Sequence, residues 1–152
     1  MKKGRILVWL LPILFFVATS FMAKAQEREE AIFSLSAGNL SKECLVYLNK
    51  DTVFVPLYEF LDFVKIVYEV NESGIFSGYV NRRDSSFSLD FNKNEYQTIG
   101  GEKMSMPPGV WYKDNAVCYV STDLLESCFA MKLQASFNQL SVYISSKYEL
   151  PM

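Results

Sequence analysis

The fold is decided by residues 53–61, Val-Phe-Val-Pro-Leu-Tyr-Glu-Phe-Leu, where a strand pattern changes to a helix pattern at one proline. The first three residues form an apolar, β-rich run. Pro56 ends that run, and its restricted φ suits the first position of a helix. Four apolar residues then follow at positions i, i+3, i+4 and i+7, which predicts a short amphipathic helix: Leu57, Phe60, Leu61 and Val64.

Strands are predicted on both sides of this helix. Residues 44–48 precede residues 52–55 across the polar triplet 49–51, which is typical of a hairpin. After the helix, apolar residues alternate over 66–70, a turn is expected at 71–74, and a returning strand at 75–80. The result is a β-β-α-β-β unit over about residues 43–81.

The same order of elements recurs over about residues 109–146. A turn at 113–115 precedes the apolar run 117–120, and Ser121, a favoured N-cap residue, stands where Pro56 stood. A second helix stripe is formed by Leu124, Leu125, Cys128 and Phe129. Strands are then expected from the alternating residues Met131, Leu133 and Ala135 and, after a turn at 138–139, from Leu140, Val142 and Ile144. A shift of 65 residues superposes the two units, so we predict an internal duplication; chance agreement of short amphipathic units is the alternative.

The remaining segments complete an α+β fold of antiparallel sheets with two short helices. A first strand is expected at 32–35 within the segment 26–42, and 148–152 is expected to be a C-terminal tail. Between the units, Phe87, Leu89 and Phe91 alternate as a strand, 96–99 follows, and Gly100-Gly101 is interpreted as a turn. Residues 102–108 are expected to form an extended loop. Met104, Met106 and Trp111 are interpreted as packing over the core rather than as a soft-metal site.

This pattern resembles the copper amine oxidase N-terminal-like domain. The resemblance rests on residues 53–61 and on 118–125, Cys-Tyr-Val-Ser-Thr-Asp-Leu-Leu, and it spans residues 43–147. Lys65 and Ala130 stand where the family usually has a glycine after each helix. The resemblance implies a small α+β module of exported bacterial proteins that is mostly non-catalytic. It implies no oxidase chemistry here, because the chain has no histidine to hold copper and Asn94-Glu95-Tyr96 is in the wrong order for the cofactor site.

Residues 1–25 are predicted to be a cleaved secretory signal. Lys2, Lys3 and Arg5 precede an apolar run over 6–17, and Ala23-Lys24-Ala25 offers the small residues that a signal peptidase accepts before Gln26. An uncleaved membrane anchor is the alternative, because the apolar stretch approaches the roughly 20 residues that span a bilayer. No cysteine stands at the cleavage site, which argues against a lipoprotein.

Composition argues against a nucleic-acid surface. The segment 1–25 holds four of the fifteen basic residues and none of the seventeen acidic ones, so the remainder has 11 positive and 17 negative side chains, a net charge of −6. Binding to phosphates requires clustered Lys and Arg. The remaining 127 residues suit one domain, residues 43–147 being its body.

No catalytic, cofactor or metal residue is predicted. The absence of histidine excludes Ser-His-Asp and Cys-His machinery and any imidazole ligand. Carboxylates alone can catalyse hydrolysis, but the acidic residues are predicted to sit singly on solvent faces or in turns: Glu59, Asp62, Asp90, Glu102, Asp123 and Glu126. We therefore expect a non-enzyme, although a carboxylate pair in a pocket would support the opposite view.

The three cysteines leave two interpretations. Cys44, Cys118 and Cys128 are an odd number in a compartment that permits disulfides. One bridge between Cys118 and Cys128 plus a free thiol is one interpretation. We favour three separate small apolar residues, since all three lie in apolar runs or on an apolar helix face.

These patterns predict an exported binding or scaffolding domain that acts in the periplasm or at the cell surface. A protein or a cell-wall polymer is favoured over a small molecule as its partner, nucleic acid is not expected, and a membrane would be engaged only through an uncleaved signal. The alternative is an N-terminal module, or a truncated remnant, of a larger outer-membrane or secretion assembly protein, because the chain ends soon after a predicted core strand.

Overall fold

The computed structural model describes residues 28–151, which form twelve strands and two short helices. The predicted signal 1–25 and its cleavage residues Ala23, Ala25 and Gln26 lie outside the described residues. The strands are β1 (Glu29–Ala37), β2 (Leu40–Asn49), β3 (Thr52–Pro56), β4 (Val67–Val70), β5 (Phe76–Tyr79), β6 (Ser86–Asp90), β7 (Glu95–Gln97), β8 (Lys103–Ser105), β9 (Trp111–Asp114), β10 (Val117–Ser121), β11 (Met131–Ser136) and β12 (Ser141–Ser146); the helices are α2 (Leu57–Phe63) and α3 (Thr122–Phe129).

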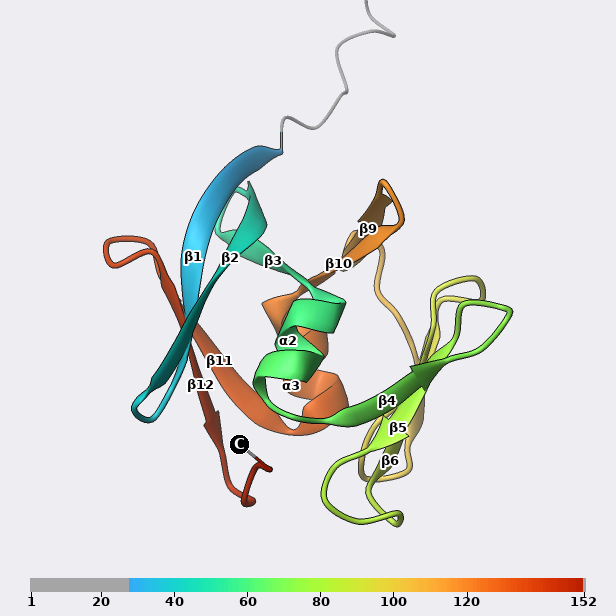
Figure 1. The fold of residues 1–152 in the computed structure, drawn as a ribbon. Coiled ribbons are helices and arrows are strands. Elements are labelled where there is room, and N and C mark those ends of the chain that lie inside the picture. The colour runs from blue at the N-terminus through green and yellow to red at the C-terminus, as the bar shows by residue number, and fades with distance from the viewer. Residues whose placement is uncertain (1–27, 152) are drawn as a thin grey trace, which may run out of the picture.

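The strands form two sheets, with the helices between them. Sheet A has the order β11-β12-β1-β2-β3-β10-β9, and sheet B is the meander β4-β5-β6-β7-β8. All neighbouring strands are antiparallel except β1 and β12, which pair in parallel. In Figure 1, α2 and α3 lie at the centre, with β1, β2, β11 and β12 on one side and sheet B on the other. None of the helices within residues 28–151 is long and apolar enough to cross a membrane.

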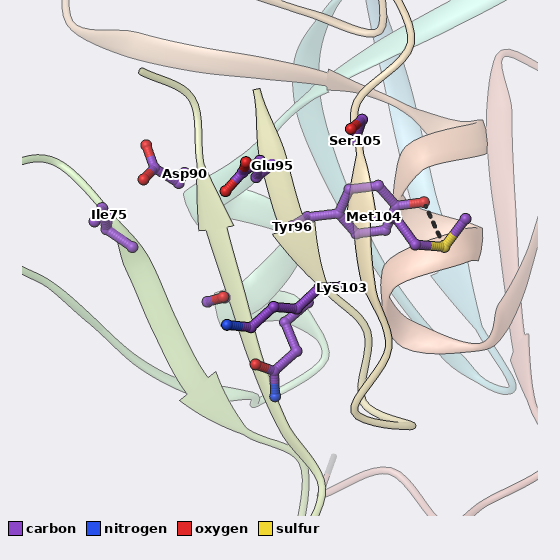
Figure 2. Close-up of a pocket in the computed structure, with 9 residues that line it drawn as sticks. Ile75, Asp90, Glu95, Tyr96, Lys103, Met104 and Ser105 are labelled. Carbon is purple, nitrogen blue, oxygen red and sulfur yellow. Dashed lines mark hydrogen bonds between the residues drawn. The ribbon is translucent and has the colours of Figure 1, made fainter. Parts of the chain in front are cut away.

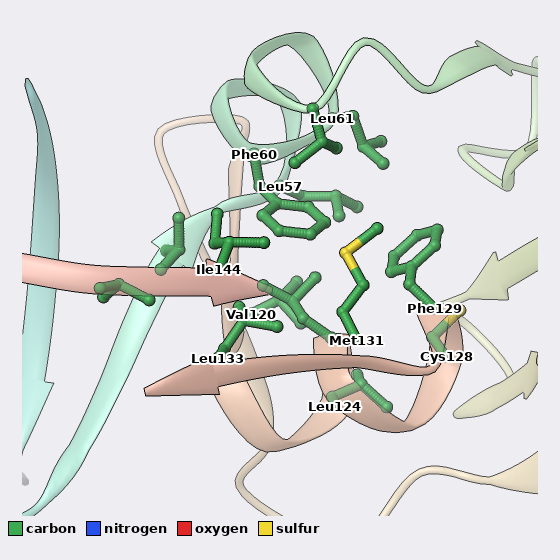
Figure 3. Packing of buried hydrophobic residues seen from close by; sticks show 14 of the residues in the cluster. Leu57, Phe60, Leu61, Val120, Leu124, Cys128, Phe129, Met131, Leu133 and Ile144 are labelled. Carbon is green, nitrogen blue, oxygen red and sulfur yellow. The ribbon is translucent and has the colours of Figure 1, made fainter. Parts of the chain in front are cut away.

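The core is centred on the two helices. Phe129 of α3 lies 5.7 Å from Phe60 of α2 and 4.8 Å from Phe87 of sheet B, measured between ring centroids. Figure 3 shows residues of α2, α3, β10, β11 and β12 meeting in this cluster. The amide of Ile99 also donates to the Cys128 carbonyl at 3.0 Å, so sheet B is attached to the end of α3. One continuous core therefore supports both sheets.

Most predicted elements are confirmed. The apolar stripes of both helices are buried, and the hydroxyl of Ser121 accepts a hydrogen bond from the amide of Leu124 at 3.3 Å, as an N-cap does. The hairpin across residues 50–51 is present. Pro56 differs from the expectation, because it is the last residue of β3 and the N-cap of α2 rather than the first helical residue.

Two segments were predicted wrongly. Residues 103–105 lie in the expected loop 102–108 but form β8, which pairs with β7. Residues 113–114 were assigned to a turn but belong to β9, and the turn is formed by Asn115 and Ala116, both with positive φ. Both strands are three or four residues long, and such short segments carry too few alternations to reveal a strand.

The two predicted units use the same order of elements but different sheets. Strands β4 and β5, after α2, belong to sheet B, whereas β11 and β12, after α3, belong to sheet A. The broad class is nevertheless as expected: a mostly β structure with antiparallel sheets and two short helices. In the predicted tail, Tyr148 and Leu150 pack against the core.

Both helices are followed by a residue with left-handed backbone. Lys65 has φ 57°, and Ala130, the C-cap of α3, has φ 48° and ψ 37°. Glycine is the usual residue for this conformation, because a Cβ atom clashes with the following carbonyl. Lys65 and Ala130 therefore hold a backbone conformation that glycine adopts at lower cost.

Replacing the exposed Ala130 by glycine is expected to raise the free energy of unfolding by about 1 kcal/mol. The substitution removes the left-handed penalty and loses no buried contact. Urea denaturation would measure the change. The matched control, Ala135→Gly within β11, should be destabilising because glycine weakens a strand. Destabilisation by Ala130→Gly would contradict the explanation.

Candidate functional site

The outer face of sheet B is hollowed and polar. A depression of about 290 Å³ lies over β6, β7 and β8. Its outward side chains come from directly paired positions, Ser88 with Gln97 and Asp90 with Glu95. Lys103 and Ser105 extend the same rows onto β8. We call this depression the sheet B hollow; Figure 2 shows its lining residues.

Strand alternation produces the polarity of the hollow. On β6, Phe87 and Leu89 are buried in the core, so Ser86, Ser88 and Asp90 between and beside them point the other way. Both helices lie on the core side of the sheet (Figure 1), which leaves the polar side uncovered by either helix. A surface of serine, amide, carboxylate and ammonium groups can offer several hydrogen bonds to a polar ligand.

The hollow contains a pair of carboxylates that the sequence pattern did not indicate. Asp90 was predicted to stand alone, but it lies directly opposite Glu95 on the neighbouring strand. One oxygen of Asp90, Oδ1, accepts hydrogen bonds from the amides of Asn92 and Lys93, each at 3.1 Å. Asp90 therefore stabilises the turn after β6 through Oδ1, and both Asp90 and Glu95 line the hollow. The pairing follows from strand register, which has no local signal in the sequence.

Two other acidic residues predicted to be solitary also have partners. Glu59 forms an ion pair with Lys42. Glu126 accepts a hydrogen bond at Oε1 from the amide of Leu133, at 2.6 Å. Both contacts connect a helix to a neighbouring strand, so these carboxylates have structural roles.

The two methionines of the predicted loop have different environments. Met106 is buried in the core, as expected, but Met104 is 45% exposed at the edge of the hollow. The sulfur of Met104 accepts a hydrogen bond from the hydroxyl of Tyr96 at 3.5 Å (Figure 2). Across residues 28–151, no group of three or more His, Cys, Asp or Glu side chains is arranged to hold a metal ion.

A cluster of four aromatic residues lies on strands β2, β3, β10 and β9 of sheet A. Tyr47, Phe54, Tyr112 and Tyr119 are buried against one another. Strand alternation puts them on the face of sheet A away from the helices, because their neighbours Val53, Val55 and Val120 lie in the core. The Tyr47 hydroxyl lies 2.7 Å from Glu30 Oε1 and 2.9 Å from Asp114 Oδ2. The guanidinium of Arg28 lies 3.7 Å above the Tyr112 ring, at cation–π distance. These contacts attach the start of β1 to β2 and to the β9–β10 hairpin.

The electrostatics of this cluster favour a structural role. The Tyr47 hydroxyl donates its one proton between Glu30, the larger influence, and Asp114. This raises the pKa of Tyr47 well above its ordinary value, because a phenolate would have no proton to donate and would face two carboxylates. Burial likewise raises the pKa of Tyr112. Both phenols stay protonated at neutral pH and cannot act as bases there.

The cysteines are three separate free thiols, as favoured from the sequence. Cys44 and Cys128 are buried, and Cys118 is half-buried. Burial raises the pKa to about 11 for Cys44 and Cys118 and to about 12 for Cys128. The thiols are therefore protonated at neutral pH and are weak nucleophiles. The alternative bridge between Cys118 and Cys128 is not formed in the structure.

In comparisons with known proteins, no family model, no curated protein and no solved structure matches the chain.

Proposed function

We propose that the chain is an exported, non-catalytic binding domain that holds a polar cell-wall polymer on the outer face of sheet B. The observation that carries this proposal is the uncovered sheet B hollow, in which six polar side chains from three adjacent strands face outward together. Their hydrogen-bonding groups suit the hydroxyl and amide groups of a glycan. Export rests on the signal pattern of residues 1–25.

The fold is consistent with this proposal. We propose that the body of the chain is a copper amine oxidase N-terminal-like domain with two related β-β-α-β-β units. In support, β2-β3-α2-β4-β5 and β9-β10-α3-β11-β12 follow the same order, and β3 pairs with β10. The left-handed residues after both helices add a further correspondence. A front module of a larger assembly protein would use the same surface to bind another protein.

The test is co-sedimentation of the exported protein with isolated peptidoglycan sacculi. The wild type should sediment with the sacculi. The double variant Gln97→Ala, Lys103→Ala should lose about tenfold or more in affinity, since each lost hydrogen bond contributes about 1 kcal/mol. The matched control is Lys132→Ala, Gln134→Ala, because it removes the same two residue types from the outer side of β11 in sheet A.

Two outcomes would overturn the proposal. If the wild type stays in the supernatant, the wall polymer is not the ligand. If the control variant loses as much affinity for the sacculi as the hollow variant, the sheet B hollow is not the binding site. Intact mass of the same preparation tests export, since cleavage predicts a chain that begins at Gln26.

The Asp90–Glu95 pair favours a second candidate function, carboxylate-based glycan hydrolysis. Release of soluble fragments from the sacculi, abolished by Glu95→Gln, would show an enzyme rather than a binding domain. Binding without such release would support the proposal.

A further inference from the structure

A second pocket lies between the two sheets and is mainly apolar. It is bounded by the β9–β10 hairpin of sheet A and by the ends of β4, β5 and β6 of sheet B, and its volume is about 230 Å³. We call it the aromatic pocket. Its apolar lining consists of Val70, Phe76, Phe91, Trp111, Ala116 and Cys118.

Three partly exposed aromatic rings form one wall of this pocket. Phe91 lies 6.0 Å from Phe76 and 4.8 Å from Trp111, measured between ring centroids. The rings come from β5, from the residue after β6, and from β9, so each sheet contributes to the wall. Half-buried aromatic faces of this kind are favourable surfaces for another ring.

Hydrogen bonds hold the pocket in shape. The side-chain amide of Asn92 donates to the Ser73 carbonyl at 2.8 Å, which joins the turn after β4 to the turn after β6. The indole N–H of Trp111 donates to Asn94 Oδ1, also at 2.8 Å. The walls are therefore ordered before a ligand arrives, which lowers the entropic cost of binding.

The pocket has positive charge. Lys113 is the only charged residue among those that line it. Burial raises the pKa of the neighbouring Cys118 to about 11, and the Lys113 charge only partly opposes this, so the thiol stays neutral. An apolar wall with one ammonium group and the amide of Asn92 matches a ligand with a ring and an anionic group.

We propose that the aromatic pocket binds a small aromatic carboxylate, whose ring packs on Phe91 and Trp111 and whose anion pairs with Lys113. The volume suits one ring system with a short acidic group, because an apolar cavity of about 150 Å³ already holds benzene. This site is separate from the sheet B hollow, so either site can bind when the other does not.

The experiment is an NMR titration with naphthalene-2-carboxylate. The protein is expressed from the full chain and purified in the form that the cell produces. The indole N–H signal of Trp111, assigned with Trp111→Phe, reports on the pocket directly. We expect a saturable shift for the wild type. Lys113→Gln should raise the dissociation constant about fivefold to tenfold through loss of the charged contact. Lys132→Gln, on the distant strand β11, should leave it unchanged.

Neutral 2-naphthalenemethanol has the same rings without the carboxylate, so it distinguishes the contribution of the charge to affinity from that of the rings. Its affinity should be lower than that of the carboxylate and should change less than about twofold in Lys113→Gln. No shift of the Trp111 signal with the carboxylate, or equal affinity for the two compounds, would overturn the proposal and leave the pocket as a packed junction between the sheets. Neither result depends on binding to sacculi.

Discussion

Phe129→Ala is expected to lower the free energy of unfolding by about 3–5 kcal/mol, the range for loss of a buried phenylalanine. Phe129 is fully buried at the end of α3, where its ring contacts both Phe60 of α2 and Phe87 of β6. Truncation would leave a cavity at the point where the two helices and sheet B meet (Figure 3). Because three elements share this ring, no single one can move to fill the space.

Urea denaturation, followed by far-UV circular dichroism, would measure this effect. The matched control is Phe137→Ala, since Phe137 is 40% exposed in the β11–β12 turn and its ring lies 6.0 Å from Phe33. Its loss should cost about 1 kcal/mol or less. Similar losses for the two variants would contradict the central position of Phe129 in the core.

Gly78→Ala is expected to destabilise the protein by about 2–3 kcal/mol, the upper part of the range for overpacking. A Cβ atom at Gly78 would lie 2.0 Å from the carbonyl oxygen of Val67 and 2.9 Å from the Cα of Tyr68. Both are backbone atoms of the paired strand β4, so no side-chain rotation can relieve the contact. The substitution must separate β4 from β5 and weaken their ladder.

Hydrogen exchange of the β4 and β5 amides would localise this damage, and thermal unfolding would give its size. Gly100→Ala is the matched control, because its Cβ would meet only the Thr98 hydroxyl, at an ordinary 3.6 Å. That variant should change the free energy of unfolding by about 0.5 kcal/mol or less. Unchanged exchange at β4 in Gly78→Ala would refute the close approach of the two strands.

The sequence by itself determined most local structure. Apolar residues at helical spacing identified both helices, Ser121 identified the start of α3, and two-residue alternation identified β6, β11 and most of β12. These signals arise within a few residues of each other, because they reflect the backbone period and local hydrogen bonding.

The tertiary structure alone decided how those elements pair. Alternation shows which side chains share a face but not which strand lies beside it. The assignment of β4–β5 to one sheet and β11–β12 to the other, and the parallel pairing of β1 with β12, therefore had no local signal. The strand β8 has only three residues, and it is a strand because it pairs with β7.

The candidate sites depend on the same long-range pairing. Asp90 faces Glu95 only because β6 and β7 adopt one register, and Trp111 joins Phe91 only because the edge strand β9 of sheet A lies beside the end of β6 in sheet B. The sequence determined which residues are polar, aromatic or charged and which face each one takes along its strand. The tertiary structure decided which of them converge, because the free energy of packing and strand pairing is shared among residues far apart in the chain.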